Sequence, residues 1–178
     1  MCDLNRIGGL IAAACAAVLV AAALSAVAAI AAGTFYGALG NSALMIAAAV
    51  AIGLALISIN LAIQSVGPCT SGPCKGPAET LQNALIALAL GLTVLLAAFI
   101  VGIFAASIPW AGVAVAIALG VGAAAVGIAL GVAGSNLAAL ETCRRTPPST
   151  GVGAAKVLVA ITLIALVMLS GGIVFGGW

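Results

Sequence analysis

Four of the five cysteines stand close to the few charged residues of the chain, and thiols are the most versatile chemical groups in it. Cys2, Cys69, Cys74 and Cys143 each lie within six positions of a charged residue, whereas Cys15 lies in a long apolar stretch and reads as a small packing residue. Four thiols that meet at one place can form a zinc or iron–sulfur site. The separation of Cys69 from Cys74 is longer than the usual ligand spacing, so this thiol cluster is the less favoured reading and we expect no metal.

A disulfide is the second reading for these thiols. Cys69 and Cys74 can meet across the short turn Thr-Ser-Gly-Pro between them. Such a bond requires an oxidising compartment. The charge distribution described below predicts a cytoplasmic location for the same loop, and we give the charge distribution more weight.

Neutral amides form a second group near the charged residues. They could line a shallow polar vestibule, or they could cap helix ends and hydrogen-bond between helices, which is the more frequent role of such side chains. Ser25 and Thr93 lie deeper in apolar sequence, where each hydroxyl can bond to the carbonyl four residues back. The amides considered for a vestibule are Asn60, Gln64, Gln82, Asn83 and Asn136.

Several kinds of chemistry have no residues to carry them. The chain has no histidine, no phosphate-binding Gly-Lys motif and no paired carboxylates in apolar sequence. No carboxylate or amine lies in the middle of an apolar stretch, and such a residue is the usual mark of a proton-coupled carrier. A net charge of +2 offers no basic patch for nucleic acid. We therefore expect no enzymatic activity, no cofactor and no nucleic-acid partner.

The composition requires a lipid environment. Hydrophobic residues make up 66% of the chain and charged residues 4%, whereas soluble domains carry about 25% charged residues. The apolar stretches are rich in Ala and Leu and do not alternate with a period of two, so they predict helices rather than a membrane barrel. The predicted fold is an all-α, polytopic transmembrane bundle in which residues 1–178 form one integral membrane domain.

The apolar stretches between the charged clusters are long enough for several crossings, because one membrane-spanning helix needs about 20 apolar residues. Pro109 marks a helix start, because proline is tolerated in the first turn and rarely inside a helix. Five spans result, at residues 8–33, 42–65, 80–107, 110–140 and 153–175.

Two spans lie between the first and second charged clusters and two between the second and third. An even number of crossings returns the chain to the same side, so every charge lies on one side of the membrane. All five basic residues fall there and none on the other side, which is the bias that marks the cytoplasmic face. We expect a multi-pass protein of the cell membrane with a cytoplasmic N-terminus and an external C-terminus. The aromatic residues are predicted to form a belt at the opposite interface: Phe35, Tyr36, Phe99, Phe104, Trp110, Phe175 and Trp178.

Small residues predict close helix packing. Glycines recur in the fourth span and let two backbones approach closely, which matters because lipid gives no hydrophobic drive between helices. This stripe could form an oligomer interface or serve packing inside the bundle, and we favour the second. Its members are Gly120, Gly127, Gly131 and Gly134.

A shift of 76 residues aligns parts of the chain with itself. Residues 47–50 then match residues 123–126, and Asn60 matches Asn136. The architecture would be one lead helix followed by two repeated hairpins, as internal repeats in transporter folds allow. A chance match of Ala-rich sequence is the alternative.

Three functions fit these observations. The favoured one is a non-enzymatic structural or accessory subunit of a larger membrane complex, whose partners are the lipid bilayer and other membrane subunits or further copies of the chain. The first alternative is a small channel or carrier for a neutral solute. The second is a membrane-inserting pore-forming toxin or holin-like protein.

Overall fold

The computed structural model describes residues 3–32, 42–70, 74–105, 109–144 and 150–176, and near several helix ends it describes the backbone alone. These residues form long α-helices and one short 3-10 turn, with no strand among them, so the predicted all-α fold is confirmed. The elements are α1 (Leu4–Ala32), α3 (Ser42–Val66), η1 (Gly67–Thr70), α4 (Lys75–Ala105), α5 (Pro109–Arg144) and α6 (Thr150–Gly176).

All five long helices are long and apolar enough to cross a membrane. The shortest, α3, has 25 residues, which corresponds to about 37 Å of helix against a hydrocarbon core of about 30 Å. Within the residues that the structure describes, each predicted span falls on one of these helices, and α5 begins at Pro109 as expected. The chain is a multi-pass integral membrane protein.

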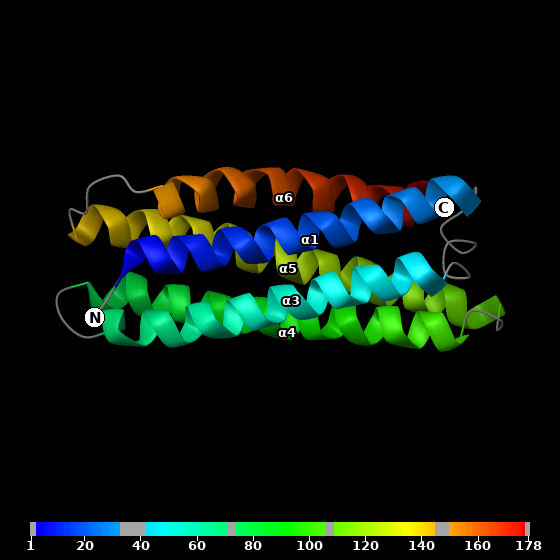
Figure 1. Cartoon of the computed structure of the whole chain (residues 1–178), viewed down its shortest axis with the longest axis horizontal. Helices are drawn as coiled ribbons and strands as arrows, with labels where there is room; N and C mark the ends of the chain where they lie inside the picture. Colours follow the sequence, from blue (N-terminus) through cyan, green and yellow to red (C-terminus); the bar gives the residue numbers. More distant parts are fainter. Residues whose placement is uncertain (1–2, 33–41, 71–73, 106–108, 145–149, 177–178) are drawn as a thin grey trace.

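The helices form a closed ring. Each packs mainly against two others, in the order α1, α3, α4, α5, α6 and back to α1. Helices α1, α4 and α6 run in one direction and α3 and α5 in the other, so the long axes lie side by side (Figure 1). The α3–α4 and α5–α6 pairs both turn at the same end of the bundle. The further prediction that these two hairpins are repeats stays a prediction.

One buried stripe on every helix faces the interior of the ring. On α1 the stripe runs Leu4, Ile7, Ile11, Ala14, Val18, Ala21 and Ser25, and on α4 it runs Ala78, Leu81, Leu85, Leu88, Leu92, Leu95 and Phe99. Steps of three and four residues alternate in both, which is the heptad spacing of coiled coils. The same spacing appears on the other three helices, for example Ala48, Ile52, Ala55, Ile59, Ala62 and Val66 on α3.

The opposite faces are also apolar. Leu90 of α4, Ile128 of α5 and Val167 of α6 are 65%, 71% and 72% exposed. Lipid accepts such side chains at no cost, so a helix can be hydrophobic all round and still have a defined inner face.

The interior of the ring is filled by side chains. The largest fully buried ones gather in the half of the bundle where the hairpins turn, and they include Ile7, Ile59, Leu85 and Leu137. The other half holds a cavity of about 30 Å³, lined by residues from all five helices, which is room for roughly one water molecule. Its lining is apolar apart from Ser25, whose hydroxyl donates to the Ala21 carbonyl at 2.9 Å.

Phe99 also lines this cavity and is 6% exposed. Phe99 lies in the half of the bundle away from the charged end, where the sequence places it, but its side chain faces the interior because the heptad stripe of α4 turns it inward. The other aromatic side chains assigned to the belt lie outside the described ones.

Glycines let neighbouring helices come close. A Cβ added at Gly91 would meet Val126 Cγ2 at 2.9 Å, and one added at Gly122 would meet Leu95 Cδ2 at 2.8 Å, so both pack α4 on α5. Gly134 faces Val159 and Gly127 faces Leu163, both on α6. These two members of the predicted stripe lie within the bundle, whereas Gly120 and Gly131 have nothing within 4 Å of an added Cβ.

Candidate functional site at the charged end

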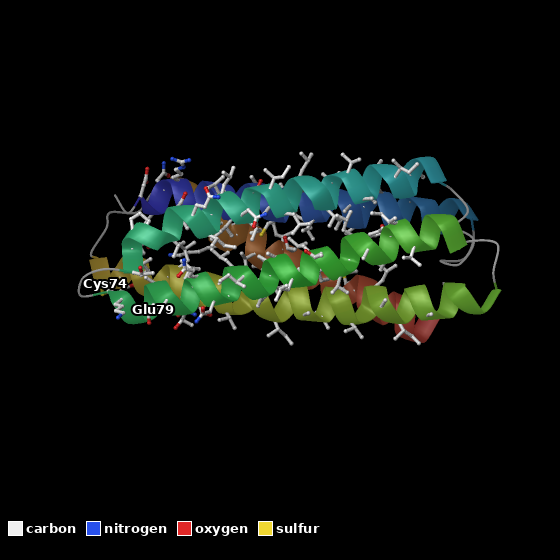
Figure 2. The ribbon with its side chains drawn as sticks, turned by 90° about the horizontal axis from the view of Figure 1, so that it is seen from below. Cys74 and Glu79 are labelled. Carbon is white, nitrogen blue, oxygen red and sulfur yellow. A yellow bond between two sulfur atoms is a disulfide. The ribbon has the colours of Figure 1, made fainter. Side chains whose placement is uncertain are left out.

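The end of the bundle where α1, α4 and α6 begin carries every described charged side chain, and we call it the charged end. Its position is marked by Cys74 and Glu79 in Figure 2. Residues close in sequence define the start of α1 at this end. Asp3 caps α1, because its Oδ1 accepts a hydrogen bond from the Arg6 backbone N–H at 3.2 Å.

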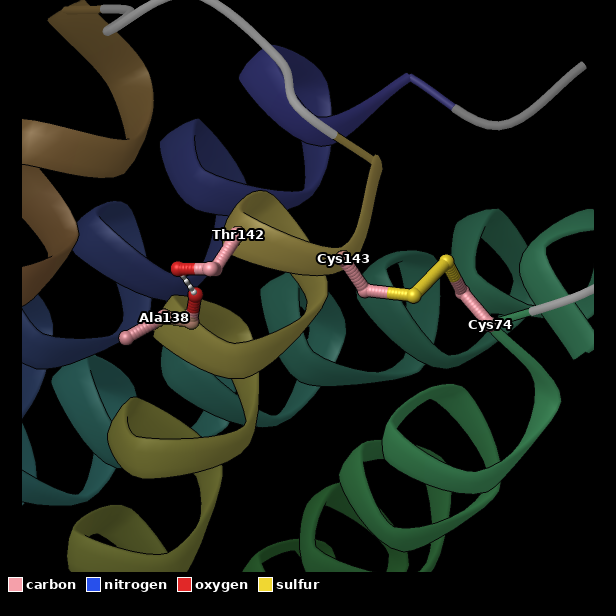
Figure 3. The surroundings of a disulfide bond; sticks show 4 residues. All are labelled: Cys74, Ala138, Thr142 and Cys143. Atoms are coloured by element: carbon pink, nitrogen blue, oxygen red, sulfur yellow. Dashed lines mark hydrogen bonds between the residues drawn. A yellow bond between two sulfur atoms is a disulfide. The ribbon is translucent and has the colours of Figure 1, made fainter.

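A disulfide joins two helices at this end. Cys74, just before α4, is bonded to Cys143 in the last turn of α5, 69 positions later (Figure 3). The helical turn that carries Cys143 is regular, and Thr142 beside it donates its hydroxyl to the Ala138 carbonyl at 3.0 Å. The Cys69–Cys74 pair considered from sequence is not formed, because α4 and α5 are neighbours in the ring and bring Cys143 to Cys74.

Cys69 is buried in η1 and is also disulfide-bonded. A sulfur in a disulfide is not a thiolate and cannot ligate zinc in that state. Of the thiol cluster considered for a metal, Cys69, Cys74 and Cys143 are disulfide-bonded in this structure, and Cys2 lies outside the described residues. No metal-binding group of three side chains occurs among the residues that the structure describes.

The start of α6 is fixed to the start of α1. Asn5 Oδ1 accepts a hydrogen bond from the Gly151 backbone N–H at 2.9 Å. A Cβ added at Gly8 would lie 2.6 Å from the Gly151 carbonyl carbon and 2.7 Å from the Val152 nitrogen. Two parallel helices therefore touch backbone to backbone at the point where the ring closes.

Ion pairs engage both lysines. Lys156 Nζ lies 3.1 Å from Glu141 Oε1 and connects α6 with α5, and Lys75 Nζ lies 3.6 Å from Glu79 Oε1 one turn along α4. Exposed pairs of this kind contribute only about 0–1 kcal/mol. Their main consequence is that both lysine charges already have a partner.

The amides considered for a vestibule lie mostly on the outer surface. Asn60, Gln64 and Asn83 are exposed, and Gln82 and Asn136 are partly buried. Asn136 Nδ2 donates to the Val132 carbonyl of its own helix at 2.8 Å. Of the five, only Gln64 borders a described hollow, and that hollow lies on the outside of the ring.

This hollow is a groove of about 390 Å³ between the start of α1 and the end of α3. It gathers a carboxylate, a guanidinium, an amide and a hydroxyl. Its lining is Asp3, Arg6, Leu61, Gln64, Ser65 and Pro68. Sequence analysis missed this site and the role of Asn5, because both depend on which helices are neighbours.

Hydroxyls in the apolar parts of the helices mostly bond within their own helix. Ser25 and Thr93 donate to the carbonyls of Ala21 and Ala89, four residues back, as predicted. Thr162 of α6 is the exception among the described residues: its hydroxyl is fully buried and makes no well-formed hydrogen bond. The thiol of Cys15, a weak hydrogen-bonding group, faces it across the α1–α6 contact.

Comparison with protein-family models, with curated proteins and with solved structures found no match. The functional interpretation therefore rests on the geometry of the bundle.

Proposed function

We propose that this chain is a non-enzymatic structural or accessory subunit of a larger membrane assembly. The observation that carries the proposal is the closed ring with its side-chain-filled interior. Such a bundle is a rigid body that presents five apolar outer faces to lipid and to other membrane helices.

The filled interior counts against transport through a single chain. A path for a neutral solute needs polar groups along its length. The heptad stripes instead place Ile7, Leu85 and Leu137 in the ring centre, and most of the amides lie outside it. Conduction by a channel, or by an inserted toxin or holin, would require a pore between several copies.

Two glycines support a helix–helix contact outside the bundle. Gly120 and Gly131 lie three turns apart on α5, and an added Cβ would meet nothing within 4 Å at either position. A helix from another subunit can approach the α5 backbone closely there.

Our proposal for the orientation keeps the N-terminus in the cytoplasm and the C-terminus outside, because the predicted topology puts all five basic residues on one side of the membrane. The fold brings the Cys74 and Cys143 sulfur atoms together on whichever side they lie, but the compartment decides whether the bond persists. In a strongly reducing cytoplasm the pair would be present as two thiols.

The test is affinity purification of the intact protein in mild detergent, read for stoichiometric partners. We expect a partner to co-purify with the natural chain and to be lost with Gly131→Leu. Gly53→Leu is the matched control, because a Cβ at Gly53 also meets nothing within 4 Å. A monodisperse chain without partners that moves solute or ions across liposome membranes would overturn the proposal.

A further inference from the structure

The groove between α1 and α3 combines opposite charges with hydrogen-bonding groups at the charged end of the bundle, where the apolar part of α1 begins. Asp3 caps α1 and Arg6 lies in its first turn, and Gln64 and Ser65 come from the last turn of α3. Its volume of about 390 Å³ lies within the range of ligand pockets, about 300–1,000 Å³.

Among the basic side chains that the structure describes, Arg6 is the one available for a ligand. Lys75 and Lys156 are each paired with a glutamate, whereas no ion pair joins the exposed Arg6 guanidinium to any other residue in the described part of the chain. A guanidinium presents a planar set of donors that matches a phosphate group. The backbone N–H groups at the start of α1 add partial positive charge beside it.

Asp3 supplies the opposite charge in the same groove. One carboxylate oxygen caps α1 through the Arg6 N–H, which leaves the other free to accept a hydrogen bond. The Ser65 hydroxyl is already bonded to the Leu61 carbonyl at 2.9 Å, while Gln64 is exposed. The groove therefore offers an anion site and a cation site side by side.

Exposed residues without charge continue along α1 and α3 from the groove, away from the charged end. Along α1, the next exposed residues after Arg6 on this side are the small Gly9 and Ala13. An added Cβ at Gly9 would meet nothing within 4 Å. Along α3, in the direction away from the charged end, the exposed residues Leu61 and Ile57 are large. Because α1 and α3 are packed neighbours, these exposed residues lie on adjoining helices, small on α1 and large on α3, and we call this strip the trough.

We propose that this groove binds a phospholipid whose headgroup carries a phosphodiester and a primary ammonium. Arg6 holds the phosphate, Asp3 accepts hydrogen bonds from the ammonium, and Gln64 donates to a phosphate oxygen. One acyl chain lies along Gly9 and Ala13, beside Leu61. The site is independent of the proposed role as a subunit, because it lies on α1 and α3, away from the open glycines of α5.

The test uses the purified, delipidated full-length protein in detergent and native mass spectrometry. Phosphatidylethanolamine, phosphatidylglycerol and inorganic phosphate are titrated separately. We expect one phosphatidylethanolamine to bind more tightly than either other ligand. Arg6→Gln should weaken its binding about tenfold or more, the usual effect of losing a charged hydrogen-bond donor. Lys75→Gln is the matched control and should bind as the natural chain does.

Two further variants separate the headgroup from the acyl chain. Asp3→Asn keeps a capping oxygen for α1 and removes the charge, so it should abolish the preference for phosphatidylethanolamine over phosphatidylglycerol. Gly9→Leu should weaken the binding of both lipids by filling the trough, and Gly153→Leu, at an equally open position on α6, should not. Thermal unfolding of each variant confirms that the bundle is intact.

Three results would overturn the assignment. The first is equal binding of phosphatidylethanolamine by the natural chain and Arg6→Gln. The second is an equal loss in Lys75→Gln, which would indicate unspecific attraction to the charged end. In the third, inorganic phosphate displaces the lipid and Gly9→Leu has no effect, which would identify a free-phosphate site instead.

Discussion

The side chain of Asn5 accepts a hydrogen bond from the Gly151 backbone N–H at 2.9 Å, across 146 positions of sequence. Helix caps usually come from the residue just before a helix, but here α1 supplies the cap of α6. The first and last helices of the ring are thereby joined at their starting turns.

Asn5→Ala should lower the free energy of unfolding by about 1 kcal/mol, the usual value of an N-terminal cap. Asn5→Asp keeps the accepting oxygen and should retain most of the stability. Unfolding in mixed detergent micelles gives the measurement, with Asn83→Ala as an exposed control. An equal loss in Asn5→Asp and Asn5→Ala would contradict the cap.

Gly8→Ala should destabilise the bundle by about 1–3 kcal/mol, because an added methyl meets backbone atoms of Gly151 and Val152 that cannot move independently. Gly9→Ala, one residue later, meets open space and should be neutral or slightly stabilising. Thermal unfolding of both variants in the same detergent makes the comparison. If the two behave alike, α1 and α6 do not touch at Gly8.

Reduction of Cys74–Cys143 should lower stability. The bond closes a loop of 69 residues, which in the chain-entropy picture corresponds to about 4 kcal/mol at most. Helices that stay inserted in the membrane when they separate have less freedom to lose, so we expect a smaller effect. In the double variant Cys74→Ser/Cys143→Ser, adding a reductant should lower the stability less than it does in the natural chain, because this bond is already absent. Non-reducing peptide mapping should find Cys74 linked to Cys143, and a Cys69–Cys74 link would refute the pairing.

Thr162→Val should stabilise the protein by about 1 kcal/mol. The Thr162 hydroxyl is buried without a well-formed hydrogen bond, and an unsatisfied polar group costs about 1–3 kcal/mol. Thr93→Val is the comparison, since that hydroxyl is exposed and bonded to Ala89 at 2.8 Å. Loss of stability in Thr162→Val would mean that the hydroxyl has a role in the core.

Lysine labelling tests the orientation directly. The only two lysines, Lys75 and Lys156, both lie at the charged end, and their side chains are 65% and 42% exposed. A membrane-impermeant amine reagent should modify them in inside-out vesicles and leave them unmodified in intact cells. Labelling of intact cells would place the charged end outside, where the disulfide is expected to persist.

The sequence by itself determined membrane residence, the five long helices of the described chain and which described residues share the charged end. These properties are local: apolar length sets a span, and charge sets where a span stops. Pro109 marked a helix start through an equally local rule, because proline is tolerated in the first turn of a helix and rarely inside one. The back-bonding of Ser25 and Thr93 was likewise predictable, because each partner lies four residues away.

Tertiary structure alone decided which face of each helix points inward. In a soluble protein, polar residues recur on the outer face of a helix and so show which positions point inward. Here Leu90 faces out and Leu88 faces in, and lipid accepts leucine at both positions. The heptad stripes, the inward turn of Phe99 and the partner of Cys74 therefore had no signal in the sequence. The groove at Arg6 and the cap from Asn5 depend on helices that are distant in sequence becoming neighbours, and the order of helices in the ring settles that.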